Sequence, residues 1–539
     1  MQPSNNLTIK QFCKPTYSHL ARKSYIWSMK QHLPIGIQSF EKLRTNNLLY
    51  VDKTEIIYRL VTSGSYYFLS RPRRFGKSLT LSTLKALYQG QKELFDGLWI
   101  QDHWDWTQQH PVIHISFSSI GYKELGLEKS IELQLRKIAK STKIELIETG
   151  TSQLFRELIE KISTRNKVVL LIDEYDKPII DYLDDLPQAK AHQKILKSFY
   201  SIIKDADPYI QFLMVTGVSK FSKVSIFSEL NNLTDLSIHP KFSTLVGYTQ
   251  TELEQYFEEG LQELIGVLAP THADLLQLVK TWYNGYSWDG KNFVYNPFSI
   301  LSFFGAGEFQ NFWFSTGTPT FLVNLLKNRN FYNLGKSEVG QAAFDSFDIE
   351  NIDTYSLLFQ TGYLTIKAKE PFGLYILDYP NREVKDSMLQ YLIAGFSKGS
   401  YAQSTPIVLK LRKAFLENNF EKIIGIINSL FKSIPSHIFI KDKEAYYHSV
   451  VFLVFQYLGQ FIEAEVHTSD GRIDAVVQTD THIYVIEFKL DESADIALQQ
   501  IQEKGYIQKY QQSDKDLVGV GINFSSTSKS VEGWETKKY

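Results

Sequence analysis

Short apolar runs alternate with helix-like periodicity over the front part of the chain, from about Leu33 to Tyr248. This alternation is typical of an α/β fold. Continuous apolar character, as in 168–172, predicts a strand buried on both faces of a parallel sheet. The predicted strands are 66–70, 112–116, 168–172 and 211–216.

From about Thr249 to Leu430 the apolar spacing is mostly helical, as in 251–264, 273–283 and 407–430. This part is interpreted as a helical lid and connector. Two turn-forming segments, 283–286 and 295–297, interrupt it among many aromatic residues and are interpreted as packed aromatic turns.

The last hundred or so residues follow an α-β-β-β-α-β order, with helices at about 442–460 and 494–510 and a final strand at 517–523. The chain is therefore expected to have four parts. They are an N-terminal extension (1–32), an α/β domain (33–248), the helical part (249–430) and a smaller C-terminal domain (431–539).

The 539 residues suffice for roughly three to four domains, and a net charge of -1 excludes a globally basic nucleic-acid coat, although a local basic groove stays compatible with it. A single cysteine, Cys13, excludes an internal disulfide framework and a cysteine-rich zinc module. The first thirty residues lack the apolar core of a signal peptide. No run reaches the roughly 20 apolar residues that cross a bilayer. We therefore expect a cytoplasmic protein without a membrane partner.

The segment from Arg71 to Ser78 lies between a predicted strand and a predicted helix, as a phosphate-binding loop does. Its last three residues complete the pattern G-x-x-x-x-G-K-[ST], but Arg71 stands at the first glycine position. A G-K-S tripeptide is common by chance, and the flanking strand and helix favour a nucleotide site. The residues expected to bind ATP there are Arg74, Phe75, Gly76, Lys77, Ser78 and Leu79.

Acidic residues end the strand 168–172, at Asp173 and Glu174. Ligands bind at the carboxyl ends of strands in an open α/β sheet, so Asp173 is placed to hold Mg²⁺ on Ser78 through water. Glu174 would orient and deprotonate the attacking water. An acidic pair after an apolar run is often only the place where a strand meets a solvated loop. Because this pair follows Lys77 by about a hundred residues, it favours an ATPase. Weaker candidates to sense the γ-phosphate are Thr216, Ser219 and Lys220.

A second group of charged residues lies near the end of the chain. A two-residue turn at 480–481 would pair two strands so that Asp474 lies opposite Glu487, and alternation puts Lys489 on the same face as Glu487. Two opposed carboxylates repel unless a cation lies between them, so Asp474 and Glu487 are expected to bind Mg²⁺. Lys489 would position a water or stabilise developing charge. An incidental ion pair at a strand end is the alternative.

Several segments together resemble the AAA-ATPase-like family of bacterial proteins that carry a C-terminal PD-(D/E)XK nuclease domain. They are Leu33-Pro-Ile-Gly36, Tyr50-Val-Asp-Lys-Thr54, Arg71 to Ser78, Ile172-Asp-Glu-Tyr-Asp-Lys177, Thr216-Gly-Val-Ser-Lys-Phe221, Trp282-Tyr-Asn-Gly-Tyr286 and Val294-Tyr-Asn-Pro297. The resemblance covers nearly everything from Leu33 onward. It implies a P-loop NTPase domain with a parallel sheet, and it makes Arg71 the family's own form of the loop.

In the C-terminal part, Asp474, Glu487 and Lys489 match the motif of a PD-(D/E)XK core, which is a restriction-endonuclease-like fold. Such cores often add a glutamate from the first helix, for which Glu444 is the expected match and Glu463 the competitor. Further candidates for the site or for nucleic-acid contact are Gln500, Tyr506, Lys509 and Tyr510. Packing of a helix face explains the tyrosines equally well.

These features predict an enzyme that binds and hydrolyses ATP and acts as an ATP-regulated nuclease on DNA, with ATP and Mg²⁺ as cofactors. The expected catalytic residues are Glu174, Asp474, Glu487, Lys489 and Glu444. The alternative is a nucleotide-dependent signalling or scaffolding switch whose C-terminal domain binds nucleic acid without cleaving it. A degenerate loop that binds no nucleotide is a third possibility.

Overall fold

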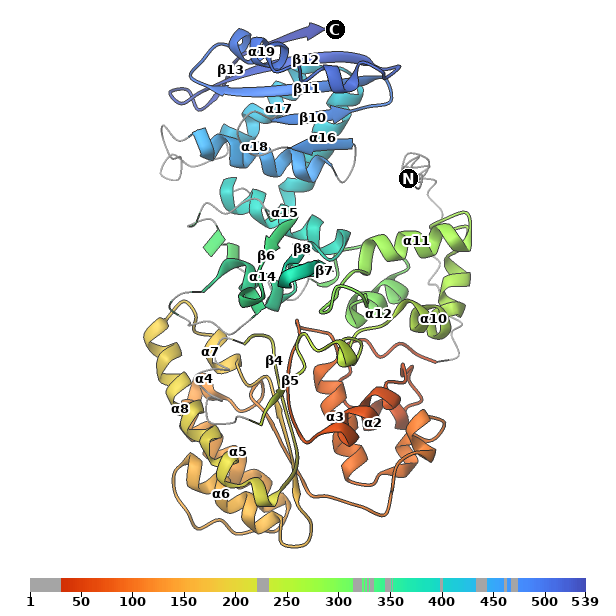
Figure 1. Ribbon diagram of the computed structural model, residues 1–539, viewed down its shortest axis with the longest axis vertical. Helices are drawn as coiled ribbons and strands as arrows, with labels where there is room; N and C mark the ends of the chain where they lie inside the picture. The colour runs from red at the N-terminus through yellow and green to blue at the C-terminus, as the bar shows by residue number, and fades with distance from the viewer. Residues whose placement is uncertain are drawn as a thin grey trace. The chain divides into compact units, whose positions relative to one another are not determined.

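The computed structural model (Figure 1) describes residues 31–539 except 221–231, 314–321, 324, 327–328, 330–333, 345–349, 351, 398–400, 433–443, 460–462 and 467–473. Side chains are also left undescribed at 396–397, 401–403, 432, 444–448 and 463–466. The chain divides into two compact units, Met1–Phe312 with Val339–Ile376 and Trp313–Glu338 with Leu377–Tyr539.

A five-stranded parallel sheet, in the order β2-β3-β4-β1-β5, forms the centre of the first unit. The strands are β1 (Tyr66–Ser70), β2 (Val112–Ser116), β3 (Val168–Asp173), β4 (Ile210–Gly217) and β5 (Thr234–Asp235). The four strands predicted from the sequence are confirmed to within one residue at each end. Every residue of β1 and β3 is buried, because helices cover both faces of the sheet.

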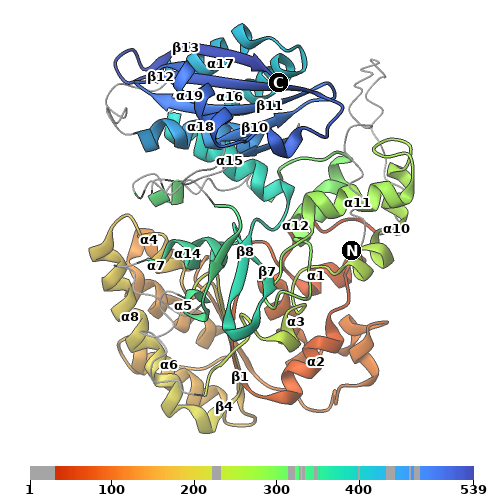
Figure 2. The ribbon, with the colours of Figure 1, turned by 45° about the horizontal axis from the view of Figure 1, so that its top comes forward.

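Helices α5, α6 and α8 lie on one side of this sheet, and α2 and α3 lie on the other (Figures 1 and 2). In α6, Leu154, Leu158 and Ile162 recur every four residues and are buried, which gives the helix one apolar face toward the sheet. The helices are α1 (Phe40–Thr45), α2 (Thr54–Ser63), α3 (Lys77–Tyr88), α4 (Tyr122–Leu125), α5 (Leu127–Ser141), α6 (Thr151–Ile162), α7 (Lys177–Ile180) and α8 (Leu186–Asp205).

Three further helices of the first unit share an aromatic core in which Phe257, Tyr283 and Phe303 are fully buried. They are α10 (Gln250–Leu264), α11 (His272–Tyr283) and α12 (Pro297–Ala306). The predicted aromatic turns join this core through antiparallel bridges, Tyr248 with Tyr295 and Tyr286 with Val294. Beyond them lie α14 (Thr354–Thr361) and a three-stranded sheet, β6-β8-β7, formed by β6 (Ser337–Val339), β7 (Thr365–Lys369) and β8 (Tyr375–Asp378).

The second unit contains a five-stranded mixed sheet, β13-β12-β11-β10-β9, in which β11 and β12 are parallel and the other pairs are antiparallel. Helix α19 covers one face, and α16 to α18 lie on the other (Figures 1 and 2). The elements are α15 (Arg382–Ser397), α16 (Tyr401–Leu416), α17 (Phe420–Lys432), α18 (Glu444–Leu458), α19 (Ala494–Glu503), β9 (Glu463–Val466), β10 (Ala475–Gln478), β11 (His482–Leu490), β12 (Asp516–Ser525) and β13 (Ser530–Lys538).

The predicted α-β-β-β-α-β order is confirmed, with β13 as an additional edge strand. Two of the predicted helices are longer than the helices in the structure. The segment 407–430 is broken at Asn418, whose φ of 51° is left-handed, so that α16 and α17 are separate. Helix α19 ends at Glu503 because Gly505, with a φ of 65°, ends the helix.

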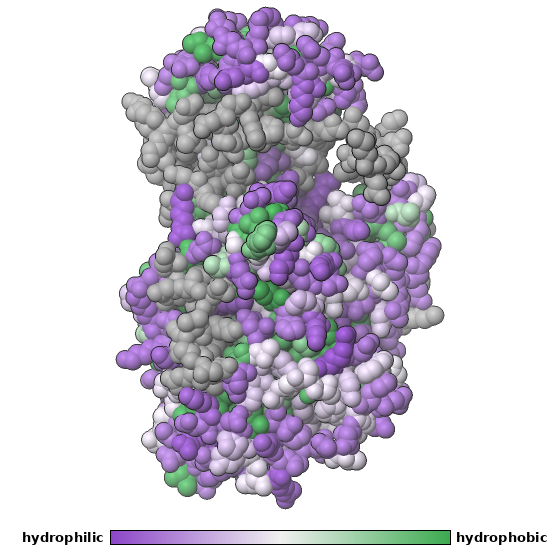
Figure 3. Space-filling view, viewed as in Figure 1, coloured by the Kyte–Doolittle hydropathy of each residue, from purple (hydrophilic) through white to green (hydrophobic). Residues whose placement is uncertain are grey.

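Hydrophilic residues predominate on the described surface seen in Figure 3, while apolar side chains are gathered in the interior of each unit. Across the described residues, no helix combines the length and the apolar character that crossing a membrane requires.

Candidate nucleotide and nuclease sites

The loop that follows β1 turns into α3 at Gly76, whose φ of 93° is a left-handed conformation that glycine adopts readily. Lys77 is the first residue of α3 and is buried. Its Nζ donates hydrogen bonds of 2.9 Å to the carbonyl oxygens of Arg71 and Pro72. Burial lowers the pKa of Lys77, and the nearby carboxylates of Asp173, Asp176 and Glu174 oppose that shift. The strand, loop and helix thus form an anion cradle with a lysine at its centre.

Asp173, at the end of β3, connects the loop with β4. Its Oδ2 accepts a 2.5 Å hydrogen bond from Ser78 Oγ, and its Oδ1 accepts one of 2.6 Å from Thr216 Oγ1. The sequence placed Ser78 and Asp173 at one magnesium site, and the structure brings their oxygens together. Hard oxygen ligands of this kind suit Mg²⁺. Thr216, one of the weaker candidates, also lies in this site.

Glu174 has a backbone φ of 53°, a strained conformation for a residue with a side chain. It lines the same cavity as Lys77 and Ser78. Partial burial raises the pKa of its carboxyl, and the charge of Asp173 raises it further. A carboxyl with a raised pKa beside a phosphate loop can accept a proton from an attacking water.

Asp176 was given no role by the sequence, although it lies in the quoted segment Ile172 to Lys177. The structure buries it almost completely, at 1% exposure. Its carboxylate accepts hydrogen bonds from the backbone N–H of Val218 (3.0 Å) and of Ser219 (2.6 Å), and from Ser219 Oγ (2.8 Å). Burial raises its pKa. Asp176 therefore fixes Val218 and Ser219, which directly follow β4, the strand that carries Thr216. The sequence analysis assigned roles only to the acidic pair at 173–174, which directly follows the strand, and therefore missed Asp176.

Ser219 and Lys220, the other weaker candidates to sense the γ-phosphate, both have contacts within the fold, and their suggested role stays a prediction. Ser219 binds Asp176, as described above. Lys220 is buried, and its Nζ lies 2.9 Å from both the carbonyl oxygen of Phe344 and Oδ2 of Asp235.

Arg71 replaces the first glycine of the loop pattern and is completely buried. Its Nη1 donates to the carbonyl oxygens of Ser70 (2.9 Å) and Ser237 (2.7 Å), and its guanidinium carbon lies 4.0 Å from the ring centroid of Trp288. Burial lowers its pKa to about 9, while Asp235 and Asp289 oppose the shift. Arg71 therefore anchors the start of the loop to Ser237 and Trp288.

Arg74 and Phe75, both expected to bind nucleotide, each contact aromatic side chains. The guanidinium carbon of Arg74 lies 3.6 Å from the ring centroid of Phe298. The ring of Phe75 is buried against Tyr286 and Trp288. Both residues also line the cavity beside the loop, and their contact with a nucleotide stays a prediction.

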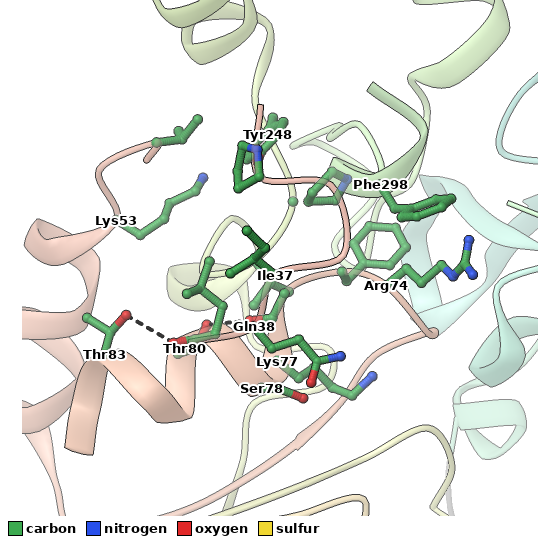
Figure 4. Close-up of a pocket in the computed structure, with 18 of the residues that line it drawn as sticks. Ile37, Gln38, Lys53, Arg74, Lys77, Ser78, Thr80, Thr83, Tyr248 and Phe298 are labelled. Carbon is green, nitrogen blue, oxygen red and sulfur yellow. Dashed lines mark hydrogen bonds between the residues drawn. The ribbon is translucent and has the colours of Figure 1, made fainter. Parts of the chain in front are cut away.

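A cavity of about 370 Å³ adjoins the loop (Figure 4). Gly76, Lys77, Ser78 and Leu79 form one wall. The other walls include residues around 34–38, 245–248 and 297–301, and several residues between 43 and 57. Ligand pockets commonly have volumes of roughly 300–1,000 Å³, so the cavity is large enough for a nucleotide.

In the second unit, the pairing of β10 with β11 confirms the predicted register: Ala475 faces Ile486, so Asp474 falls opposite Glu487. Asp474 Oδ2 accepts a 2.8 Å hydrogen bond from the N–H of Phe488. Lys489 Nζ lies 3.9 Å from Glu487 Oε1. The structure thus brings Asp474, Glu487 and Lys489 together at the same end of two paired strands.

Glu487 is only 3% exposed, and burial followed by the charge of Asp474 raises its pKa to about 8. Its Oε1 accepts a hydrogen bond from Gln500 Nε2, whereas Oε2 has no hydrogen-bond partner among the described residues. A buried carboxylate oxygen without a partner is costly unless a cation binds it. This donor set fits a divalent cation. The described residues contain no group of three or more His, Cys, Asp and Glu side chains suited to a metal, so further ligands would be needed.

The remaining nuclease candidates have mixed outcomes. Gln500 of α19 reaches the site through Glu487. Tyr506 packs in an apolar cluster with Val476 and Ile501, and Tyr510 lies against that cluster, as the packing alternative expects. Lys509 Nζ lies 5.3 Å from the ring centroid of Tyr510. The side chains of Glu444 and Glu463 lie outside the described part of the chain, so the choice between them stays a prediction.

Comparison with known proteins finds a family for each of the two domains. The AAA-ATPase-like family, described as predicted AAA-ATPase, matches residues 34–227, and the PD-(D/E)XK nuclease superfamily matches residues 442–534. The chain is also 40% identical over 522 residues to a protein of Azotobacter chroococcum mcd 1, described as "Uncharacterized protein in vnfD 5'region"; the match covers 94% of this chain and 98% of that protein. The chain therefore belongs to the family of AAA-ATPase-like proteins with a C-terminal PD-(D/E)XK nuclease domain.

Proposed function

We propose that this protein binds and hydrolyses ATP in its first unit and cleaves DNA in its second unit with the help of Mg²⁺. The proposal rests on the convergence of Asp474, Glu487 and Lys489, in which one carboxylate oxygen of Glu487 has no hydrogen-bond partner among the described residues. The four-part division of the chain and a cytoplasmic location belong to the same proposal.

In the ATPase site, Lys77 would leave the carbonyl oxygens it now contacts and bind the terminal phosphates. Ser78 and Asp173 would hold Mg²⁺, which neutralises charge on the phosphates when bound. Glu174 would orient the attacking water and accept its proton. Thr216 would keep the Asp173 carboxylate in place through its 2.6 Å hydrogen bond.

In the nuclease site, Asp474 and Glu487 would hold Mg²⁺, which polarises the phosphodiester when bound. Water would add to phosphorus and lose a proton to solvent, while the bond to one ester oxygen breaks and the leaving oxygen takes up a proton from solvent. Lys489 would stabilise the charge that develops on the phosphate. Gln500 would orient Glu487 through its hydrogen bond.

The presence of an ATPase site and a nuclease site in one chain supports regulation of cleavage by ATP. The test measures cleavage of labelled DNA and RNA, and ATP hydrolysis, for wild type, Lys77→Ala and Asp474→Ala in the presence of Mg²⁺. Asp514→Ala is a matched control, because Asp514 is an exposed carboxylate of the second unit. Cleavage is expected to be lost in Asp474→Ala, kept in Asp514→Ala and no longer responsive to ATP in Lys77→Ala. A wild type that hydrolyses ATP but never cuts nucleic acid would refute the nuclease assignment.

A further inference from the structure

The side-chain amide of Asn523 is a polar group of the second unit that the proposed cleavage chemistry does not use. Asn523 lies near the end of β12. Its Oδ1 is buried and has no hydrogen-bond partner among the described residues. A buried amide oxygen gives up its hydration and gains nothing in return unless a donor reaches it. The position of Asn523 in the sheet indicates which donor that is.

Asn523 lies directly beside Lys489 in the sheet. Strands β11 and β12 are parallel, and their register pairs Lys489 with Asn523. Neighbouring strands lie roughly 4.8 Å apart, and paired residues of parallel strands turn their side chains to the same face. A lysine side chain is long enough to span that spacing. The ammonium of Lys489 can therefore reach the amide oxygen of Asn523.

The other neighbours of Asn523 in the sheet favour the same pairing. On the side away from β11, Asn523 pairs with Gly533 of β13, which has no side chain to offer a donor. Helix α19 covers the face to which Asn523 points (Figures 1 and 2), because a Cβ at Gly521, two residues earlier, would clash with the carbonyl oxygen of Ala494. A carbonyl oxygen is an acceptor and cannot donate to the amide oxygen. Lys489 is thus the cationic donor beside it.

The ion pair between Lys489 and Glu487 is loose. The distance from Lys489 Nζ to Glu487 Oε1 is 3.9 Å, which is longer than a hydrogen bond. Once Glu487 binds Mg²⁺, the carboxylate shares its negative charge with the cation, and the cation repels the ammonium. The ammonium then needs a different acceptor for its three N–H groups. The oxygen of Asn523 is such an acceptor, on the side of Lys489 away from Asp474.

We infer that Asn523 is a positioning residue of the nuclease site, whose Oδ1 accepts a hydrogen bond from Lys489 Nζ when Glu487 binds Mg²⁺. The inference rests on the proposed nuclease function and adds to it a residue outside the Asp474, Glu487 and Lys489 set. Drawing the ammonium away from Glu487 frees that carboxylate for the cation. It also fixes the ammonium in one place, where it can stabilise charge on the phosphate.

Calorimetric titration of the full chain with Mg²⁺, without nucleotide or DNA, tests the inference in a double-mutant cycle of Asn523→Leu and Lys489→Met. The binding heat that Asp474→Ala removes belongs to the nuclease site. Asn523→Leu is expected to weaken Mg²⁺ binding there about tenfold, the contribution of one hydrogen bond from a charged donor. In the Lys489→Met background it should have no effect, because the amide acts through the lysine. Gln512→Leu is the matched control, since Gln512 is an exposed amide of the same unit.

Asn523→Ala removes the same oxygen without the bulk of leucine and should repeat the result, so the test does not depend on the folding of one variant. Equal weakening with and without Lys489 would overturn the positioning role, because Asn523 would then act on the metal directly. Unchanged Mg²⁺ affinity in both Asn523 variants would overturn it as well, while the nuclease site stands. If Asp474→Ala removes neither binding heat nor DNA cleavage, the proposed nuclease function fails, and this inference with it.

Discussion

Replacing Arg71 by alanine should destabilise the first unit without removing a phosphate ligand. The guanidinium donates two hydrogen bonds to backbone carbonyls and lies on the ring of Trp288, all in a fully buried position. Hydrogen bonds from a charged donor contribute about 1.5–3 kcal/mol each, and a desolvated cation–π contact about 2 kcal/mol. Relief of the cost of burying the charge offsets part of this sum. We expect a net loss of about 3 kcal/mol.

Differential scanning calorimetry of wild type, Arg71→Ala and Arg73→Ala measures this effect. Arg73 is the control, because it is an exposed arginine of the same loop. A loss of about 3 kcal/mol should lower the midpoint of the first unit by about 4 °C, with Arg73→Ala close to wild type. An unchanged midpoint for Arg71→Ala, together with a loss of ATP affinity as large as that of Lys77→Ala, would refute the supporting role and make Arg71 a phosphate ligand.

Three further outcomes are expected. Asp173→Asn should lower the ATPase rate on the order of 10²-fold while tripolyphosphate still binds, as measured by phosphate release and calorimetry. Glu487→Gln should lower Mg²⁺-dependent DNA cleavage by a similar factor without changing ATPase activity, and a variant that cuts normally would exclude Glu487 as a metal ligand. Burial raises the pKa of Asp386 to about 6, so the folded state retains this proton more strongly than the unfolded chain does. The stability that this group contributes is present below about pH 4 and is lost as the pH rises through about 6. Over that range the free energy of unfolding of Asp386→Asn, measured in urea, should rise relative to wild type by up to about 3 kcal/mol. A difference between the two proteins that does not change with pH would contradict this.

Features that depend on local periodicity could be predicted from the sequence. The strands β1 to β4 carry strong apolar runs, and the register that opposes Asp474 and Glu487 followed from counting outward from a short turn. Strand β13 was missed because most of its residues are exposed at the edge of its sheet, so it lacks an apolar pattern.

Contacts between distant segments could not be predicted in the same way. Arg71 interacts with Ser237 and Trp288, which lie more than 160 residues away, and no local pattern announces such partners. The role of Asp176 depends on the path of the chain after β4, and the cavity wall around Tyr248 depends on how α10 to α12 pack. Sequence indicates which residues carry charge, but packing decides which of those charges a ligand can reach.

The left-handed backbone of Glu174 has a consequence for how the sequence can vary. Glycine would adopt a φ of 53° without strain, so Glu174→Gly should cost little stability or even increase it, while removing the carboxylate. Selection for folding alone would therefore tend to replace this glutamate. If related proteins retain this glutamate, selection for ATP hydrolysis explains it. A relative with glycine at this position should keep the fold but no longer hydrolyse ATP.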